Sequence, residues 1–199
     1  MGSIGYIASV AILIVWGASL YAERIGGRSS MRAFRIARYA SWGAFAAIVL
    51  SLAYFSRLQF LTWQADAVTR YLLPPYRPVG YFLEYVWLRL WAPYALSACV
   101  AAVAYAAASF ANRLRGGVFF ESEEPYFLAT GIFMTGHPGW VAYVVLTLAA
   151  YLAVSAVRFA FVRHAERISF YRFWLPCAAM IIACETALSG YGWYADLFI

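Results

Sequence analysis

The sequence predicts an all-α protein, a polytopic integral membrane bundle of about six transmembrane helices with one amphipathic helix at the membrane interface. Of the 199 residues, 65% are hydrophobic and only 12% are charged, whereas about a quarter of the residues of an average soluble domain are charged. The hydrophobic residues form long runs, and arginines gather in the segments between the runs. These observations exclude a soluble globular domain and a disordered chain.

The long apolar runs define the expected spans. A helix needs about 20 apolar residues to cross the roughly 30 Å hydrocarbon layer of a bilayer. We treat residues 1–199 as one transmembrane domain and expect spans at about 4–22, 39–55, 80–111, 123–137, 140–157 and 173–192. The third of these is longer than a bilayer requires, so it must tilt, project or bend, and Pro93 is the expected bend point.

Two segments differ from ordinary spans. Residues 56–73 repeat apolar side chains at helical spacing and place polar ones elsewhere on the wheel, which is typical of a helix lying in the membrane interface. The helix expected at 123–137 is only about 21 Å long. It is either a short crossing that neighbouring helices shield from lipid or a re-entrant half-helix.

The arginines predict the orientation. All fifteen basic residues are arginines, and eleven of them fall in the segments 23–38, 112–124 and 158–172. The positive-inside rule then gives six crossings, with both termini outside and the arginine-rich loops inside. A re-entrant fourth helix would give five crossings and place the arginines of 158–172 outside, so six is preferred. The expected location is a bacterial inner membrane or an organellar membrane.

Basic residues near the ends of spans are expected to face lipid headgroups. Anionic lipids are therefore the expected partners. Nucleic acid is not expected, because the basic surface lies against the membrane. The arginines assigned to headgroups are Arg28, Arg32, Arg35, Arg163 and Arg167.

Charged residues inside spans are rare and costly, so Glu84, Arg89 and Glu185 are candidate functional residues. Arg89 and Glu185 are expected at similar depths, about a third of the way in from the outer side. We expect them to form an ion pair that either fixes the registry of two helices or takes part in a proton or ion relay. The alternative is an unpaired Arg89 that extends to the outer interface.

A second group of polar residues flanks the short fourth helix. Carboxylates and a histidine can bind a metal ion or catalyse proton transfer, and the group consists of Glu121, Glu123, Glu124 and His137. However, the helix would separate His137 from Glu123 by about 20 Å, so a single site would need a ligand from another span. The simpler interpretation is a solvated helix start and a turn histidine.

Three functions follow from these features. The favoured one is a non-catalytic membrane subunit or scaffold within a larger assembly, because the loops are short, alanine-rich faces suit close helix packing and catalytic motifs are missing. Other membrane subunits are then the expected partners. The alternatives are a small ion or solute transporter that uses Glu84, Arg89 and Glu185, and a membrane enzyme with its site near the acidic residues and His137. The sequence predicts no particular substrate, metal or cofactor.

Overall fold

The computed structural model describes residues 7–18, 31–116, 120–121, 123–161 and 171–188. Every regular element in these ranges is helical, which confirms the predicted all-α helical bundle. The elements are a helix at Ile7–Ala18, α2 at Met31–Ala65, η1 at Thr69–Leu72, α3 at Val79–Val86, the π-helix η2 at Trp87–Trp91, α4 at Ala92–Leu114, α5 at Glu124–Thr135, α6 at Gly139–Phe161 and α7 at Tyr171–Leu188.

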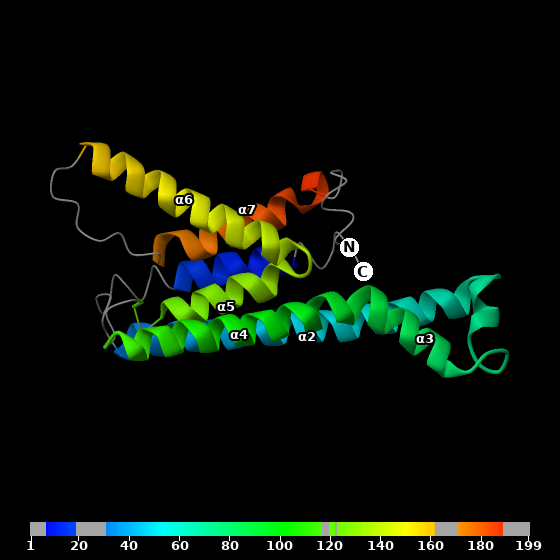
Figure 1. Ribbon diagram of the computed structural model, residues 1–199. Coiled ribbons are helices and arrows are strands. Elements are labelled where there is room, and N and C mark those ends of the chain that lie inside the picture. Colours follow the sequence, from blue (N-terminus) through cyan, green and yellow to red (C-terminus); the bar gives the residue numbers. More distant parts are fainter. Residues whose placement is uncertain (1–6, 19–30, 117–119, 122, 162–170, 189–199) are drawn as a thin grey trace.

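Successive helices run in alternating directions (Figure 1). As a result, the start of α2, the end of α4, the start of α5, the end of α6 and the start of α7 all lie at one end of the bundle. We call this the arginine end. The arginines there whose side chains the structure describes are Arg35, Arg38, Arg113, Arg115 and Arg158.

Three helical segments are long and apolar enough to cross a membrane by length and composition: Arg38–Ala65, Val79–Leu114 and Gly139–Phe161. The helices at Ile7–Ala18 and Phe173–Glu185 are apolar but shorter. These properties fit a membrane location, because apolar segments of this length are typical of helices that cross a bilayer.

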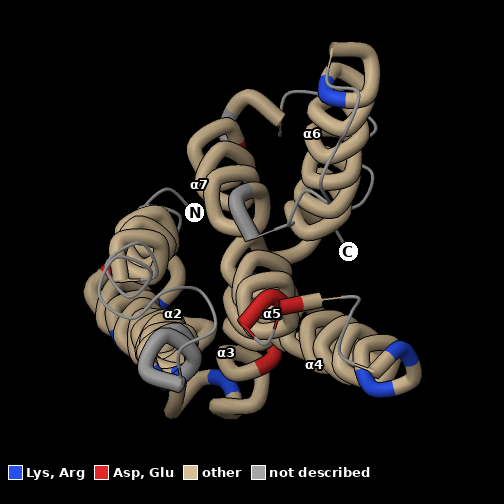
Figure 2. Tube along the Cα trace, turned by 90° about the vertical axis from the view of Figure 1, so that its left-hand side faces the viewer, with Lys and Arg blue, Asp and Glu red and all other residues tan. Residues whose placement is uncertain are grey.

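The short helix α5 lies at the centre of the bundle (Figure 2). It packs against α2, α4, α6 and α7, and nine of its twelve residues are buried. A helix that is apolar all round must be covered on every side. The neighbouring helices supply this cover, which a short crossing and a re-entrant half-helix both require. The main core surrounds it and includes Ile12, Ile48, Leu52, Phe127, Ile132, Tyr143 and Leu175.

The predicted boundary between a second span and a separate interfacial helix is absent. Residues 56–65 continue α2 without a break, and only 69–72 form a separate 3₁₀ turn. The hydroxyl of Ser56 donates a hydrogen bond to the carbonyl of Leu52 within the same helix. No proline occurs before Pro74, so nothing in the backbone stops the helix at the expected position.

Helix α2 and the segment α3–η2–α4 form a long hairpin that projects beyond the other helices (Figure 1). The five residues of η2 come just before Pro93, which was the expected bend point. Proline has no backbone N–H to donate within a helix, and π-type turns are a common way to accommodate such an irregularity. We call residues 56–91 the hairpin tip.

Candidate functional site

The three charged residues predicted inside spans are not brought together. Glu84 and Arg89 are both exposed on the hairpin tip, whereas Glu185 is half-buried on α7, close enough to Tyr94 for its charge to act on that phenol. No ion pair joins Arg89 to Glu185 among the described residues. Counting residues from the span ends assumed that 80 and 192 lie at the same level, but the hairpin carries α3 past the end of α7 (Figure 1).

The acidic residues at the start of α5 are buried, not solvated as expected. Glu123 and Glu124 are 2% and 1% exposed. The backbone N–H of Glu121 donates to Oε2 of Glu124 at 3.1 Å, which satisfies one polar group before the helix begins. Neither carboxylate oxygen of Glu123 has a hydrogen-bond partner in the described structure. Burial, and then the nearby charges of Glu121 and Glu124, raise the pKa of Glu123.

His137 lies at the opposite end of α5 from these acids. Its Nδ1 accepts a hydrogen bond from Nε1 of Trp140 at 3.2 Å, which suits a histidine in the turn between α5 and α6. The twelve residues of α5 separate the two ends by about 18 Å. Within the described ranges, no three His, Cys, Asp or Glu side chains are close enough together to hold a metal ion.

Of the arginines assigned to lipid headgroups, Arg28, Arg163 and Arg167 lie outside the described residues. Arg32 belongs to the first turns of α2. Arg35 is exposed at the arginine end, where a headgroup can reach it.

The hairpin tip has a second cluster of buried hydrophobic residues, which adjoins the main core through Leu90 and Trp91. Trp63, Leu73, Phe82 and Val86 are buried there. The ring of Trp63 contacts those of Tyr85 and Phe82, with centroid distances of 4.8 and 5.4 Å. Aromatic contacts of this kind are directional and hold the two arms in a fixed arrangement.

Polar contacts fix the two ends of the tip. At its base, Nε1 of Trp91 donates to Oγ of Ser56 at 3.0 Å and so links η2 to α2. At its far end, Oδ2 of Asp66 accepts hydrogen bonds from the backbone N–H of Val68 at 3.1 Å, and from the N–H and hydroxyl of Thr69 at 2.8 and 3.0 Å. These bonds lower the pKa of Asp66, the largest contribution coming from the backbone N–H of Thr69.

The outer surface of the tip is apolar and aromatic. Val68 is 75% exposed and Tyr76 is 63% exposed. Further large side chains are exposed around them, at Leu61, Tyr71, Tyr81, Leu83, Trp87 and Leu88. Four arginines and two carboxylates are interspersed, and Arg70 lies over the ring of Tyr71 at 5.0 Å.

Sequence reasoning treated 56–73 and 80–111 as unrelated segments and so missed this surface. The signal was present in two places: the helical pattern has no breaker between residues 39 and 65, and the segment starting at Gly80 is too long for one crossing. Both helical segments are longer than one membrane crossing needs, as expected for the two arms of a hairpin that projects from the bundle.

Comparison with known proteins adds no functional information. No protein-family model matches the chain, and no curated protein or solved structure matches it significantly.

Proposed function

We propose that this chain is a non-catalytic integral membrane subunit of a larger membrane protein assembly, and that the hairpin tip docks another protein of that assembly. One observation carries the proposal. The tip projects past the rest of the bundle with its own core, yet it leaves large apolar side chains exposed. Large apolar side chains that are exposed together on a rigid element are typical of an interaction site.

Helix lengths support a tip outside the hydrocarbon layer. The 28 residues of Arg38–Ala65 and the 36 residues of Val79–Leu114 correspond to helices of about 42 and 54 Å, whereas the hydrocarbon layer takes up roughly 30 Å. With the arginine end at one interface, about 12 Å of α2 and about 24 Å of the other arm extend past the opposite side of the hydrocarbon, where acyl chains do not cover the apolar side chains.

The internal order of the tip supports docking to a protein. Packed rings and the Trp91–Ser56 hydrogen bond give the surface its shape before a partner arrives. Binding then loses less conformational entropy than it would with a flexible loop. Exposed tyrosine, tryptophan and arginine are also the residue types that contribute most to protein interfaces.

Orientation is part of the proposal. We infer that the arginine end faces inside and that both termini and the hairpin tip face outside. Alternating helix directions support this (Figure 1), because they allow six passages with the arginine-rich ends together. Epitope tags at the two chain ends should both be accessible from outside in intact cells. Tags found on opposite sides would contradict this orientation.

The transporter and enzyme alternatives have less support. Transport was expected to use Glu84, Arg89 and Glu185 along one path, but the first two lie exposed on the tip. An enzyme was expected to combine the acidic residues with His137, which α5 holds apart. The residues that each alternative needs therefore lie apart, and this favours neither transport nor catalysis.

The decisive experiment compares the particle extracted from native membranes before and after the tip surface is changed. The protein is solubilised in a mild detergent, its mass is measured by light scattering and the co-purifying chains are identified by mass spectrometry. We expect Val68→Ser combined with Tyr76→Ser to release the partner chains and leave a smaller particle.

The matched control is Leu114→Ser combined with Phe159→Ser. These residues are 71% and 85% exposed, and they lie at the arginine end, away from the tip. The control should retain the wild-type particle. A wild-type chain that leaves native membranes as a stable monomer, or partners lost equally in both variants, would overturn the proposal.

A further inference from the structure

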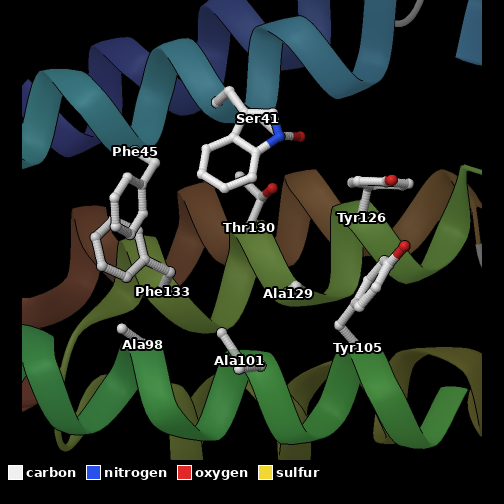
Figure 3. A pocket seen from close by; sticks show the side chains of 11 residues that line it. Ser41, Phe45, Ala98, Ala101, Tyr105, Tyr126, Ala129, Thr130 and Phe133 are labelled. Carbon is white, nitrogen blue, oxygen red and sulfur yellow. The ribbon is translucent and has the colours of Figure 1, made fainter. Parts of the chain in front are cut away.

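A groove of about 460 Å³ opens on the side of the bundle between α2 and α4, with α5 as its floor (Figure 3). α5 packs against both helices and holds them apart. Most of the lining is apolar, and its polar groups include the hydroxyls of Ser41, Tyr105, Tyr126 and Thr130.

The groove exists because its walls carry small side chains. Ala98, Ala101 and Ala102 form the α4 wall, and Ala129 belongs to the floor. At one end of the groove, the rings of Phe45 and Phe133 contact each other with centroids 4.6 Å apart (Figure 3). This end of the slot is therefore apolar.

The other end of the groove is polar and cationic. The rings of Tyr105 and Tyr126 lie 5.0 Å apart, and the hydroxyl of Tyr126 interacts with the side chains of both Tyr105 and Arg38. Arg35 precedes Arg38 by one turn on α2, so both arginines lie on one side of the helix. This end of the groove coincides with the arginine end of the bundle.

We infer that the groove binds one anionic phospholipid from the leaflet at the arginine end, with its phosphate at Arg38 and an acyl chain along the alanine-lined slot. Seven residues of α2 separate Arg38 from Phe45, or about 10 Å along the axis, so one molecule can contact both. Guanidinium groups bind phosphate by charge-assisted hydrogen bonds, and basic pockets between membrane helices are known sites for anionic headgroups.

Charge decides in favour of a lipid over the helix of a protein partner. A docked apolar helix would fill the slot but would offer no phosphate to the guanidinium of Arg38. A zwitterionic lipid offers the same chains, but its own cationic group opposes Arg38. Only the anionic lipid matches both ends of the groove, and its headgroup and chain are tested separately.

The headgroup is tested by native mass spectrometry of the purified full chain in a non-ionic detergent. Phosphatidylglycerol and phosphatidylcholine with identical acyl chains are titrated, and lipid retention is measured. We expect retention of phosphatidylglycerol in preference to phosphatidylcholine. Arg38→Gln should lower phosphatidylglycerol retention about five-fold, which corresponds to the loss of one basic residue near an anionic headgroup.

Arg113→Gln is the matched control: Arg113 is exposed at the same end, but the groups that act on the groove residue Tyr126 are Tyr105 and Arg38. It should leave retention unchanged, and Arg38→Lys should preserve part of the preference. Equal retention of the two lipids by the wild type, or equal losses in the Arg38→Gln and Arg113→Gln variants, would overturn the inference.

The position of the acyl chain is tested by filling the slot with a larger side chain. Ala102 lines the groove, whereas Ala107 is exposed on the same helix and does not line it. Ala102→Trp should abolish retention of phosphatidylglycerol and Ala107→Trp should not, with helical content and melting temperature checked for both. A photoreactive acyl chain should label residues 98–105 and 126–133. Normal retention by a folded Ala102→Trp variant, or labelling confined to other segments, would place the lipid elsewhere and refute the inference.

Discussion

The phenol ring of Tyr143 in α6 occupies the space that a side chain at position 131 of α5 would need. A Cβ built on Gly131 would overlap the hydroxyl oxygen and Cζ of that ring, and both residues are buried. The absence of a side chain at Gly131 therefore lets α6 lie against the central helix. Close approach of helices at small residues is a common way to pack membrane proteins.

We predict that Gly131→Ala destabilises the bundle by about 1–3 kcal/mol, the usual cost of overpacking a tight core. The measurement is the free energy of unfolding in mixed micelles. Gly43→Ala is the matched control, because a Cβ at Gly43 meets nothing within 4 Å. It should be neutral or slightly stabilising, since alanine is the better helix former. Adding Tyr143→Leu to Gly131→Ala should recover part of the loss, and strictly additive effects would contradict the proposed contact.

The aromatic core of the hairpin tip should be sensitive to Trp63. This side chain is 7% exposed, and its ring contacts Tyr81, Phe82 and Tyr85. Removing a large buried aromatic side chain costs about 3–5 kcal/mol, so Trp63→Ala should speed amide hydrogen exchange across residues 56–91. The main core should keep its protection because its buried residues are different ones. Trp87→Ala, at a residue 52% exposed, serves as control; equal exchange in the two variants would argue against a distinct tip core.

Neutralising Glu123 should stabilise the protein at neutral pH. Its carboxylate is buried without a hydrogen-bond partner in the described structure and lies near the charges of Glu121 and Glu124. Its negative charge is therefore costly, and glutamine removes that charge while keeping nearly the same shape. We therefore expect a higher melting temperature for Glu123→Gln than for the wild type at pH 7.5. Glu84→Gln, at an exposed carboxylate, should leave the melting temperature unchanged.

The same residue predicts a pH dependence. Burial raises the folded-state pKa of Glu123 above its ordinary value of 4.5, so the folded state holds the proton to higher pH than the unfolded state does. The stabilising contribution is complete below pH 4.5 and is lost as the pH rises through the folded-state pKa. The stability gap between Glu123→Gln and the wild type should thus narrow on acidification from pH 7.5 towards 4.5. A gap that stays constant with pH would show that the charge is not the cause.

Asp66 predicts the opposite pH dependence at the far end of the tip. Its three hydrogen bonds require the carboxylate, and they lower its pKa below the ordinary value of 3.8. Its contribution is therefore present above pH 3.8 and is lost as the pH falls through the lowered pKa. Asp66→Ala should speed hydrogen exchange at residues 66–73 at pH 7. Asp66→Asn should do so less, because its amide oxygen still accepts hydrogen bonds, and identical exchange in all three proteins would contradict this role.

Much of the architecture could be predicted from local sequence. The runs around Ile12, Ile48 and Leu146 are apolar over lengths typical of membrane helices. The prediction of an all-α bundle was based on these runs. The short helix at 124–135 was also found, because Pro125 and the acids beside it mark a helix start and Gly136 marks its end. Each of these features depends on residues a few positions apart.

The sequence by itself determined the helical class, the apolar segments and the clustering of arginines, since hydropathy and backbone propensity act over one or two turns. Only the tertiary structure decided that the hairpin of α2 and α3–η2–α4 extends beyond the other helices, that Glu123 is buried, and that Glu185 and Arg89 lie apart. Burial and distance depend on which helices become neighbours and at what relative height. That outcome is set by contacts such as Gly131 with Tyr143, between residues that no local pattern connects.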